Sequence, residues 1–552
     1  MRIEPAFLAV SLSLAAATPA LSADLRCPRA RDADPAVVAE RALERAQWPE
    51  AAMLYACAAR ASGDVAVAER ATRSAFENHQ LDRAVDSARR WLELDPKNEV
   101  ARRHLATSLL RRYDEDAASQ EFSELLRTSY SDRARGYLVL LGILSEEEND
   151  TGAARVIDAL GESDRELPEA HYAASVLWQR AEDGTRALAA AERAVALRAD
   201  WLQAELARVR ALATLGRDAE ALEHSAKLAA GQDPLARLSH AWLLLGQDRR
   251  AEAVAAFEDL QRSGGPAATD AVEALAAIAL DERRLDDASK LLQAAARNPE
   301  QAVALAWHLG RLAEERGEKA NAARHYLAIS AGPRAVAGQL RAYRLLRGLN
   351  APELAEMLID DFLAASPADT TDVIAGVAAV LVDEGQGEEA IALVDRAYEL
   401  MPDDGLLLAR GFLFERLDRI PEAVADLRKV AERRPNDPMA QNALGYTLVD
   451  RTRSVEEGHR LIDRALAAKP DSYAIQDSKG WALVQGGDLE GGKRWLETAW
   501  KRSEDPEVAA HLGETLWRMG REAEARKLWD DALAANPDSP PLKRAIERRT
   551  KP

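Results

Sequence analysis

The feature that most constrains the fold of this 552-residue chain is a small residue that returns about every 34 positions. The first of these residues is Ala51, and the last is Ala525, 474 residues and fourteen steps later. The positions between them are Ala84, Ala118, Ala153, Ala187, Ala221, Ala253, Ala288, Ala322, Ala355, Ala390, Ala423, Gly458 and Gly492. A fixed period of this length predicts a stack of repeated units.

Other residue types keep the same register. One set of glycines recurs in the first half of a unit: Gly411, Gly445, Gly480 and Gly513. A second set falls in the middle of a unit, where glycine tolerates a turn: Gly317, Gly385, Gly487 and Gly520. Prolines close several units, because proline cannot continue a helix: Pro96, Pro402, Pro435, Pro470 and Pro537. Each unit is therefore predicted to be a pair of helices, and the scarcity of alternating Val, Ile, Thr and Tyr predicts an all-α chain.

The units resemble tetratricopeptide repeats, about fifteen of them from Pro35 to Pro537. The resemblance is strongest in the last four units and at 303–336, and weakest around Ala153, Ala288 and Ala355. It implies a right-handed superhelical α-solenoid, continuous from residue 24 to residue 540, with a concave face lined by the first helix of each pair. The stretch QRSGGPAATD, residues 261–270, is predicted to be a hinge or a loosened contact.

The two ends of the chain differ from the repeats. Residues 1–23 have a short apolar core from Ala6 to Ala17, followed by Leu-Ser-Ala, as a secretory signal peptide does. Cleavage after Ala20 is the alternative to cleavage after residue 23. The protein is therefore predicted to be exported. Residues 541–552 are basic and are predicted to form a solvated tail.

The chain has two cysteines, Cys27 and Cys57. An even number of cysteines in an exported protein suggests a disulfide between them, which would tie down the N-terminal end. Arg26 stands directly before Cys27, where lipid attachment requires a small residue. The sequence therefore leaves membrane association open.

No residue pattern predicts catalysis, a metal site or a cofactor. The nine histidines are scattered, and GDLEGGKR at 487–494 has arginine where a phosphate-binding loop needs Ser or Thr. The formal net charge of −19 disfavours binding to nucleic acid. We therefore predict a protein that is not an enzyme and that binds other proteins.

Residues of the last units are the candidates for partner binding. The residue after the first-helix glycine should face the concave side, and there the chain has Phe412, Tyr446 and Trp481. The remaining candidates are Trp517, Asn442 and Asp477. Aromatic side chains there suit an extended peptide or a partner helix, or they fill the space between adjacent first helices.

The last units also resemble a narrower family. NALGYTLVDR (442–451), DSKGWALVQGGD (477–488) and DPEVAAHLGETLWRMGR (505–521) are similar to exported proteobacterial tetratricopeptide proteins, as are AERATRSAF (68–76) and WLELDP (91–96). The family includes the lipoprotein adaptor of a periplasmic carboxyl-terminal processing protease. The resemblance implies a periplasmic adaptor, with association to the outer membrane left open, that activates such a protease and presents peptidoglycan hydrolases to it. The alternative is a scaffold for an envelope assembly machine, in polysaccharide or pilus export.

Overall fold

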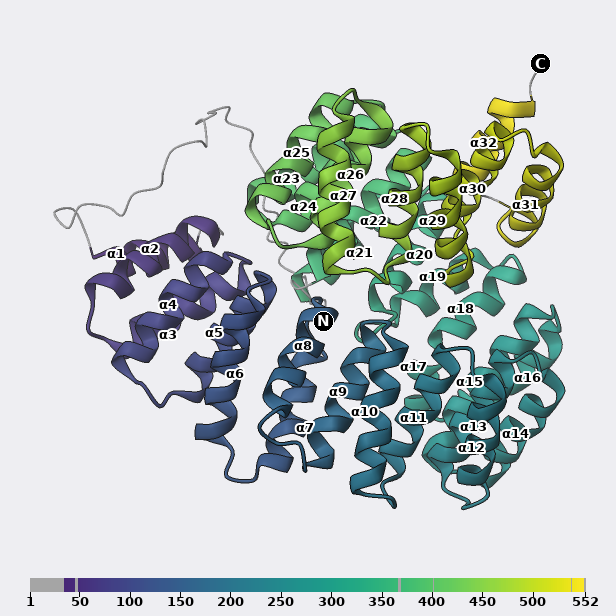
Figure 1. Cartoon of the computed structure of the whole chain (residues 1–552), viewed down its shortest axis with the longest axis horizontal. Coiled ribbons are helices and arrows are strands. Elements are labelled where there is room, and N and C mark those ends of the chain that lie inside the picture. Colours follow the sequence, from purple (N-terminus) through teal and green to yellow (C-terminus); the bar gives the residue numbers. More distant parts are fainter. Residues whose placement is uncertain (1–33, 45–47, 366–368, 401, 538, 551–552) are drawn as a thin grey trace, which may run out of the picture.

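A computed structural model describes residues 34–44, 48–365, 369–400, 402–537 and 539–550. All regular structure in these ranges is helical, and 32 helices are arranged as a solenoid (Figure 1). The predicted all-α solenoid is therefore confirmed. The predicted signal peptide and Cys27 lie outside the described residues. Cys57 is buried in α2 and is disulfide-bonded, and its pairing with Cys27 stays a prediction.

Thirty of the helices form fifteen successive pairs, in agreement with the predicted number. The first helices are α1(Pro35–Glu44), α3(Val65–Glu77), α5(Glu99–Arg111), α7(Arg133–Leu144), α9(Pro168–Arg180), α11(Leu202–Thr214), α13(Pro234–Gly246), α15(Pro266–Asp281), α18(Ala306–Glu315), α20(Ala335–Arg347), α22(Thr370–Asp383), α24(Asp404–Arg416), α26(Pro438–Arg451), α28(Tyr473–Gln485) and α30(Pro506–Arg518).

The second helix of each pair carries the periodic small residue. The second helices are α2(Trp48–Ala61), α4(Leu81–Leu94), α6(Glu115–Ser129), α8(Asp150–Gly161), α10(Gly184–Leu197), α12(Asp218–Ala229), α14(Arg250–Ser263), α16(Leu285–Ala295), α19(Lys319–Leu327), α21(Pro352–Ala365), α23(Gly387–Leu400), α25(Ile420–Arg433), α27(Val455–Ala468), α29(Leu489–Arg502) and α31(Glu522–Ala535). The two remaining helices are α17(Pro299–Ala304) and α32(Pro540–Thr550).

The periodic small residues lie where the helices approach most closely. All fifteen are buried, and none of the thirteen alanines is more than 1% exposed. At Gly458 and Gly492 the approach is backbone to backbone. An added Cβ would lie 2.6 Å from the carbonyl oxygen of Gly445 at the first position and 2.7 Å from that of Gly480 at the second. A larger residue at these positions would push the paired helices apart.

The first helices lie on the inner side of the curve. Along most of the chain each first helix packs against the next first helix, whereas successive second helices pack closely only at α2–α4 and α6–α8. Elements on the inside of a bend are closer together than those on the outside. The inner surface of the superhelix is therefore built mainly from first helices.

The stacking is irregular in three places. Helix α17 is inserted between α16 and α18, α7 packs on α9 rather than on α8, and α21 packs little on α22. These departures lie in the units around Ala288, Ala153 and Ala355, where the repeat pattern is weakest. At 261–270, α14 and α15 share one apolar cluster that includes Phe257 and Ala271, and a hinge in this stretch stays a prediction.

The predicted solvated tail is wrong for residues 541–550, which form most of α32. This helix packs on α30, and its Leu542 is fully buried. On the same face, two turns later, Arg549 donates from Nε to Glu514 Oε2 of α30 at 2.9 Å. This face of α32 thus covers the last pair, as a terminal cap must.

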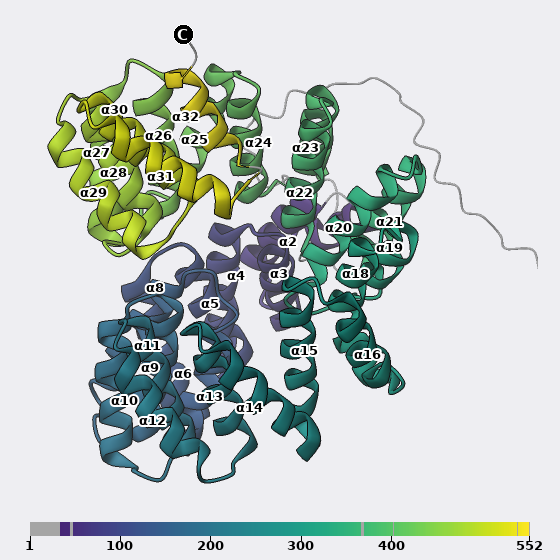
Figure 2. The same cartoon turned by 90° about the vertical axis from the view of Figure 1, so that its right-hand side faces the viewer.

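The superhelix curves back on itself. The late helices α26 and α27 lie beside the early helix α8 in both views of the molecule (Figures 1 and 2). Within the described residues, no helix is both long and apolar enough to cross a bilayer.

Candidate functional site

A cluster of aromatic, acidic and histidine side chains lies on four consecutive first helices, α24, α26, α28 and α30. We call it the inner cluster. Its members are Glu415, Tyr446, Asp450, Asp477, Trp481, Glu507 and His511. Three of the residues predicted from sequence, Tyr446, Trp481 and Asp477, are therefore brought together.

Directional contacts join successive helices of the inner cluster. Trp481 donates from Nε1 to Asp450 Oδ1 at 2.7 Å, which connects α28 to α26. His511 lies with Nδ1 2.9 Å from Asp477 Oδ2, which connects α30 to α28. The Trp481 and His511 rings are stacked, with centroids 4.4 Å apart and an interplanar angle of 16°. These contacts fix the relative position of three repeats.

Tyr446 shows that the cluster lies on a concave surface. Its hydroxyl is 3.4 Å from Glu507 Oε1 and 3.4 Å from His511 Nε2, although α26 and α30 are two repeats apart. Side chains from helices separated by a whole repeat can meet only on the inner side of the curve. The inner cluster is therefore part of the concave face.

The inner cluster has an excess of negative charge. Burial raises the pKa of the Glu415 carboxyl, and Asp450 raises it further. The Glu507 side chain is exposed, but partial desolvation by the surrounding protein raises the pKa of its carboxyl, and the Asp477 carboxylate raises it further. The four carboxyl groups of the cluster outnumber its one histidine, so a positive group brought to this surface would be attracted to it.

His511 is the cation inside the cluster. Burial lowers the pKa of its imidazole, but the Asp477 carboxylate outweighs that effect, and the pKa is raised overall. Burial and the neighbouring Asp450 and Glu507 carboxylates raise the pKa of the Tyr446 hydroxyl well above its ordinary value. The carboxylate of Asp477 thus favours the protonated form of the histidine and orients its ring.

Several of the residues predicted to line an exposed wall are buried. Trp481 is 5% exposed and fills the space between adjacent first helices, so the prediction of an exposed aromatic wall is wrong at this position. Asn442 and Asp477 are also buried. Tyr446 is half-buried, and Phe412 is 45% exposed and remains available to a partner. Trp517 is half-buried away from the cluster and stacks on Trp529 at 5.8 Å.

Four members of the inner cluster were not predicted from the sequence: Glu415, Asp450, Glu507 and His511. A signal for them exists, because Asp450 lies one helical turn after Tyr446 and Glu415 three residues after Phe412. Glu507 and His511 are themselves four residues apart and share one helix face.

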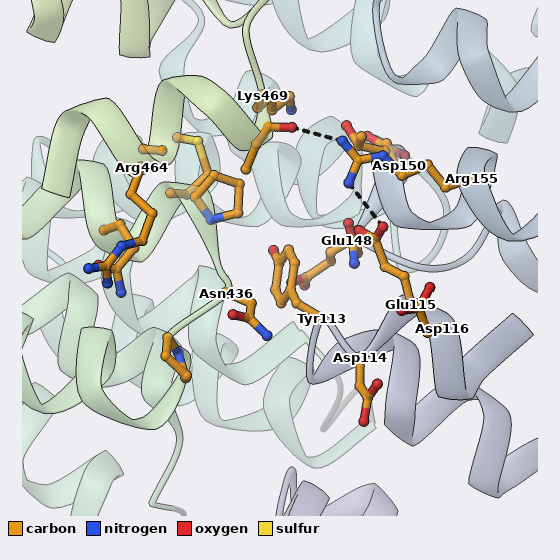
Figure 3. Close-up of a pocket in the computed structure, with 18 residues that line it drawn as sticks. Tyr113, Asp114, Glu115, Asp116, Glu148, Asp150, Arg155, Asn436, Arg464 and Lys469 are labelled. Carbon is orange, nitrogen blue, oxygen red and sulfur yellow. Dashed lines mark hydrogen bonds and ion pairs between the residues drawn. The ribbon is translucent and has the colours of Figure 1, made fainter. Parts of the chain in front are cut away.

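A second candidate site lies where the late pairs meet the early pairs (Figure 3). A cavity of about 410 Å³ separates the α5–α6 and α7–α8 turns from the start of α26 and the end of α27. Arg155 in α8 donates to Glu115 Oε2 and to the backbone carbonyl of Ala468, each at 3.0 Å. The Tyr113 hydroxyl interacts with the carboxylate of Asp437, which raises its pKa beyond the effect of burial. We call these five residues the inter-turn seam.

A second cavity, of about 440 Å³, lies beside the inserted helix α17. It is lined mostly by aliphatic side chains of α16–α19, among them Leu309 and Leu312. Across the described ranges of the chain, no group of three or more His, Cys, Asp or Glu residues is arranged to bind a metal ion.

Comparison with known proteins agrees with the geometry of the helix pairs. The family model described as "Tetratricopeptide repeat" matches residues 238–302, 408–473 and 478–540. These three segments carry tetratricopeptide repeats. The last two of these matched segments contain every residue of the inner cluster except Asp477, which lies in the gap between them.

Two relatives of known sequence share part of the chain. The TPR repeat-containing protein PA4667 of Pseudomonas aeruginosa is 36% identical over 209 residues, 38% of this chain and 35% of that protein. The bacteriophage adsorption protein A of Escherichia coli is 31% identical over 91 residues, 16% of this chain and 9% of that protein. The matched regions thus span about a third of the first relative and less than a tenth of the second.

The similarity to solved structures is weak. The Cut9–Hcn1 hetero-tetramer of the APC/C matches over 93% of this chain and 96% of that chain, with 16% identity and a TM-score of 0.31. The thermophilic TPR protein TTC0263 of Thermus thermophilus matches over 32% of this chain and 97% of that chain, with 21% identity and a TM-score of 0.29. Similarities of this strength say nothing about the shape of this superhelix.

Proposed function

We propose that the chain is a non-enzymatic adaptor of the bacterial cell envelope that binds a protein partner on the concave face of its last four pairs. The observation that supports this most directly is the inner cluster. It combines an exposed aromatic side chain at its edge, Phe412, with two acidic side chains that can attract a cationic ligand, Glu415 and Glu507. Tetratricopeptide solenoids use such curved surfaces to bind other proteins.

The finer proposal is that the partner is a carboxyl-terminal processing protease, to which the adaptor presents peptidoglycan hydrolases. Its support is the resemblance of segments 442–451, 477–488 and 505–521 to exported adaptor proteins, together with the expected signal at 1–23. The proposed location is the periplasm. Mass spectrometry of the protein from fractionated cells should find it in the periplasm and beginning at residue 24, and an intact residue 1 would contradict export.

Affinity capture after crosslinking in the envelope tests the proposed surface. The variant Phe412→Ala/Glu507→Gln should lose about tenfold or more of the captured protease, because it removes the exposed aromatic side chain and one carboxylate of the site. Met357→Ala is the matched control, since Met357 is 52% exposed but lies on the second helix α21.

Equal capture of the protease by both variants would show that the inner cluster is not its binding site. Recovery of polysaccharide or pilus export components in place of a protease would support the assembly scaffold instead.

A further inference from the structure

The inter-turn seam joins parts of the chain that are far apart in sequence. Arg155 and Ala468 are 313 residues apart, and their hydrogen bond connects the fourth pair to the thirteenth. In a solenoid each unit normally contacts only its neighbours. A contact between residues this far apart in sequence therefore constrains the curvature of all the helix pairs that lie between α8 and α27.

No described apolar core crosses the seam. The apolar cluster of the early pairs runs from Val85 to Ala221, and the clusters of the late pairs begin at Leu407. None of these clusters includes residues from both sides. The two sides are instead separated by the 410 Å³ cavity and held by polar contacts. Such an interface has little of the apolar burial that makes contacts permanent.

The charges on the two sides of the cavity are opposite. Exposed carboxylates of the early pairs line one wall, Asp114, Asp116 and Glu148, and basic groups of the late pairs line the other, Arg464 and Lys469. None of these five forms an ion pair with any described residue. They attract each other across the gap, and at about 0.1 M salt that attraction is screened over about 10 Å.

Two specific contacts set the closed position. The Arg155 guanidinium binds the carbonyl of the last residue of α27, where a cation is also favoured by the helix dipole. Tyr113 stands in the α5–α6 turn with φ +58°, at the position where other pairs have glycine, such as Gly520, or a polar residue with positive φ, such as Glu182 or Asp418. A bulky residue is disfavoured in this conformation, and here its ring lies between the two walls (Figure 3).

We propose that the seam is a reversible clasp: the superhelix closes when Tyr113 and Arg155 dock on the α26 and α27 ends, and opens as salt weakens the attraction between the two walls. The closed state restricts lateral entry to the concave face, and the open state admits a partner. The clasp is independent of the partner proposed above, since no residue of the inner cluster belongs to it.

Small-angle X-ray scattering of the full mature chain at low and high salt tests the clasp. The double variant Tyr113→Phe/Arg155→Ala should have a radius of gyration several ångströms larger than wild type at low salt, and wild type should approach that value at high salt. Amide exchange at 112–116 and 436–440 should rise about tenfold in the variant. Arg180→Ala is the control, because Arg180 pairs with Asp150 within neighbouring pairs.

A second variant keeps the test decisive if the double variant changes the fold. Cysteines introduced at 155 and 468 and joined by a short bismaleimide should make the radius of gyration of the otherwise wild-type chain insensitive to salt. Superimposable scattering of wild type and the double variant at both salt concentrations, with unchanged exchange, would overturn the clasp. Circular dichroism with equal helix content in all chains separates opening from unfolding.

Discussion

Two buried histidines occupy the same repeat position, two residues before a first-helix glycine, in different parts of the solenoid. His511 lies in the regular last pairs, and His308 lies in α18, next to the inserted helix α17. Each contacts an acid one repeat earlier: His511 contacts Asp477 at 2.9 Å, and His308 contacts Glu273 at 3.3 Å.

The two sites differ in what the second ring nitrogen of the histidine contacts. In His511 it faces Tyr446, two repeats earlier, whereas the Nδ1 atom of His308 has no hydrogen-bond partner among the described residues. A regular register brings side chains two repeats apart to one concave surface, and the insertion of α17 interrupts that register. The same residue at the same position is thus part of a network in one place and partly unsatisfied in the other.

The largest expected effect comes from removing the side chain that the His511 ring stacks on. Trp481→Ala should reduce the free energy of unfolding of the last pairs by about 4 kcal/mol, because it leaves a cavity and an unpaired Asp450. Phe412→Ala, at an exposed position in the first helix two pairs earlier, should change it by less than about 0.5 kcal/mol.

Denaturant unfolding together with amide exchange in α26–α31 measures both variants, since a repeat array need not unfold in one step. Similar losses in the two variants would show that Trp481 does not hold the last pairs together.

Replacing each histidine by leucine tests the comparison directly. His511→Leu leaves the buried Asp477 carboxylate without its cation and should cost about 3 kcal/mol. His308→Leu should cost less than about 1 kcal/mol, because Glu273 keeps its ion pair with Arg334 and an unsatisfied nitrogen is removed. Equal costs, measured by the same denaturant titration, would mean that the register of the surrounding repeats is irrelevant to either site.

The backbone contact between paired helices should be the next most sensitive feature. Gly458→Ala places a Cβ 2.6 Å from the carbonyl oxygen of Gly445, and we expect a loss of about 1–3 kcal/mol in thermal or chemical unfolding. Gly142→Ala is the control: its added Cβ would meet nothing within 4 Å in α7, so the change should be neutral or slightly stabilising. A neutral Gly458→Ala would show that the pair can separate without penalty.

The smallest expected effect is the pH dependence of the last pairs. The pKa of His511 is raised in the folded state, so its contribution to stability is complete below the unfolded pKa of about 6.5. That contribution is lost as pH rises through the folded pKa. Melting curves of α26–α31 should therefore shift to lower temperature as pH rises above neutrality, and His511→Asn should remove this part of the shift. A wild-type melting temperature that is constant across this range would contradict the protonated state of His511.

The periodic part of the fold could be predicted from the sequence because a single small residue per unit decides it. The number of pairs, the burial of Ala51 through Ala525 and even the weak units around Ala153, Ala288 and Ala355 follow from that register. The tail was mispredicted because its basic residues outnumber the few apolar ones. Leu542 and Ala545 are nevertheless spaced as one side of a helix.

The candidate site was only partly predictable, because it depends on curvature. Trp481 is buried because α26, α28 and α30 approach one another closely. The spacing of residues within one repeat does not determine the distance between helices of different repeats. The same holds for Tyr446 and His511, whose contact spans two repeats, and for Arg155 and Ala468, whose contact spans nine.

The hydrogen bond between Arg155 and Ala468 closes the intervening chain into a ring. Because the ring is built from helix pairs, its length can change only by a whole pair. Deleting or duplicating one pair between α9 and α26 would move the end of α27 away from Arg155, and the hydrogen bond to Ala468 could no longer form. The number of helix pairs from α28 onward does not affect this closure. Insertions and losses among related chains should accordingly accumulate outside this ring and be rare within it.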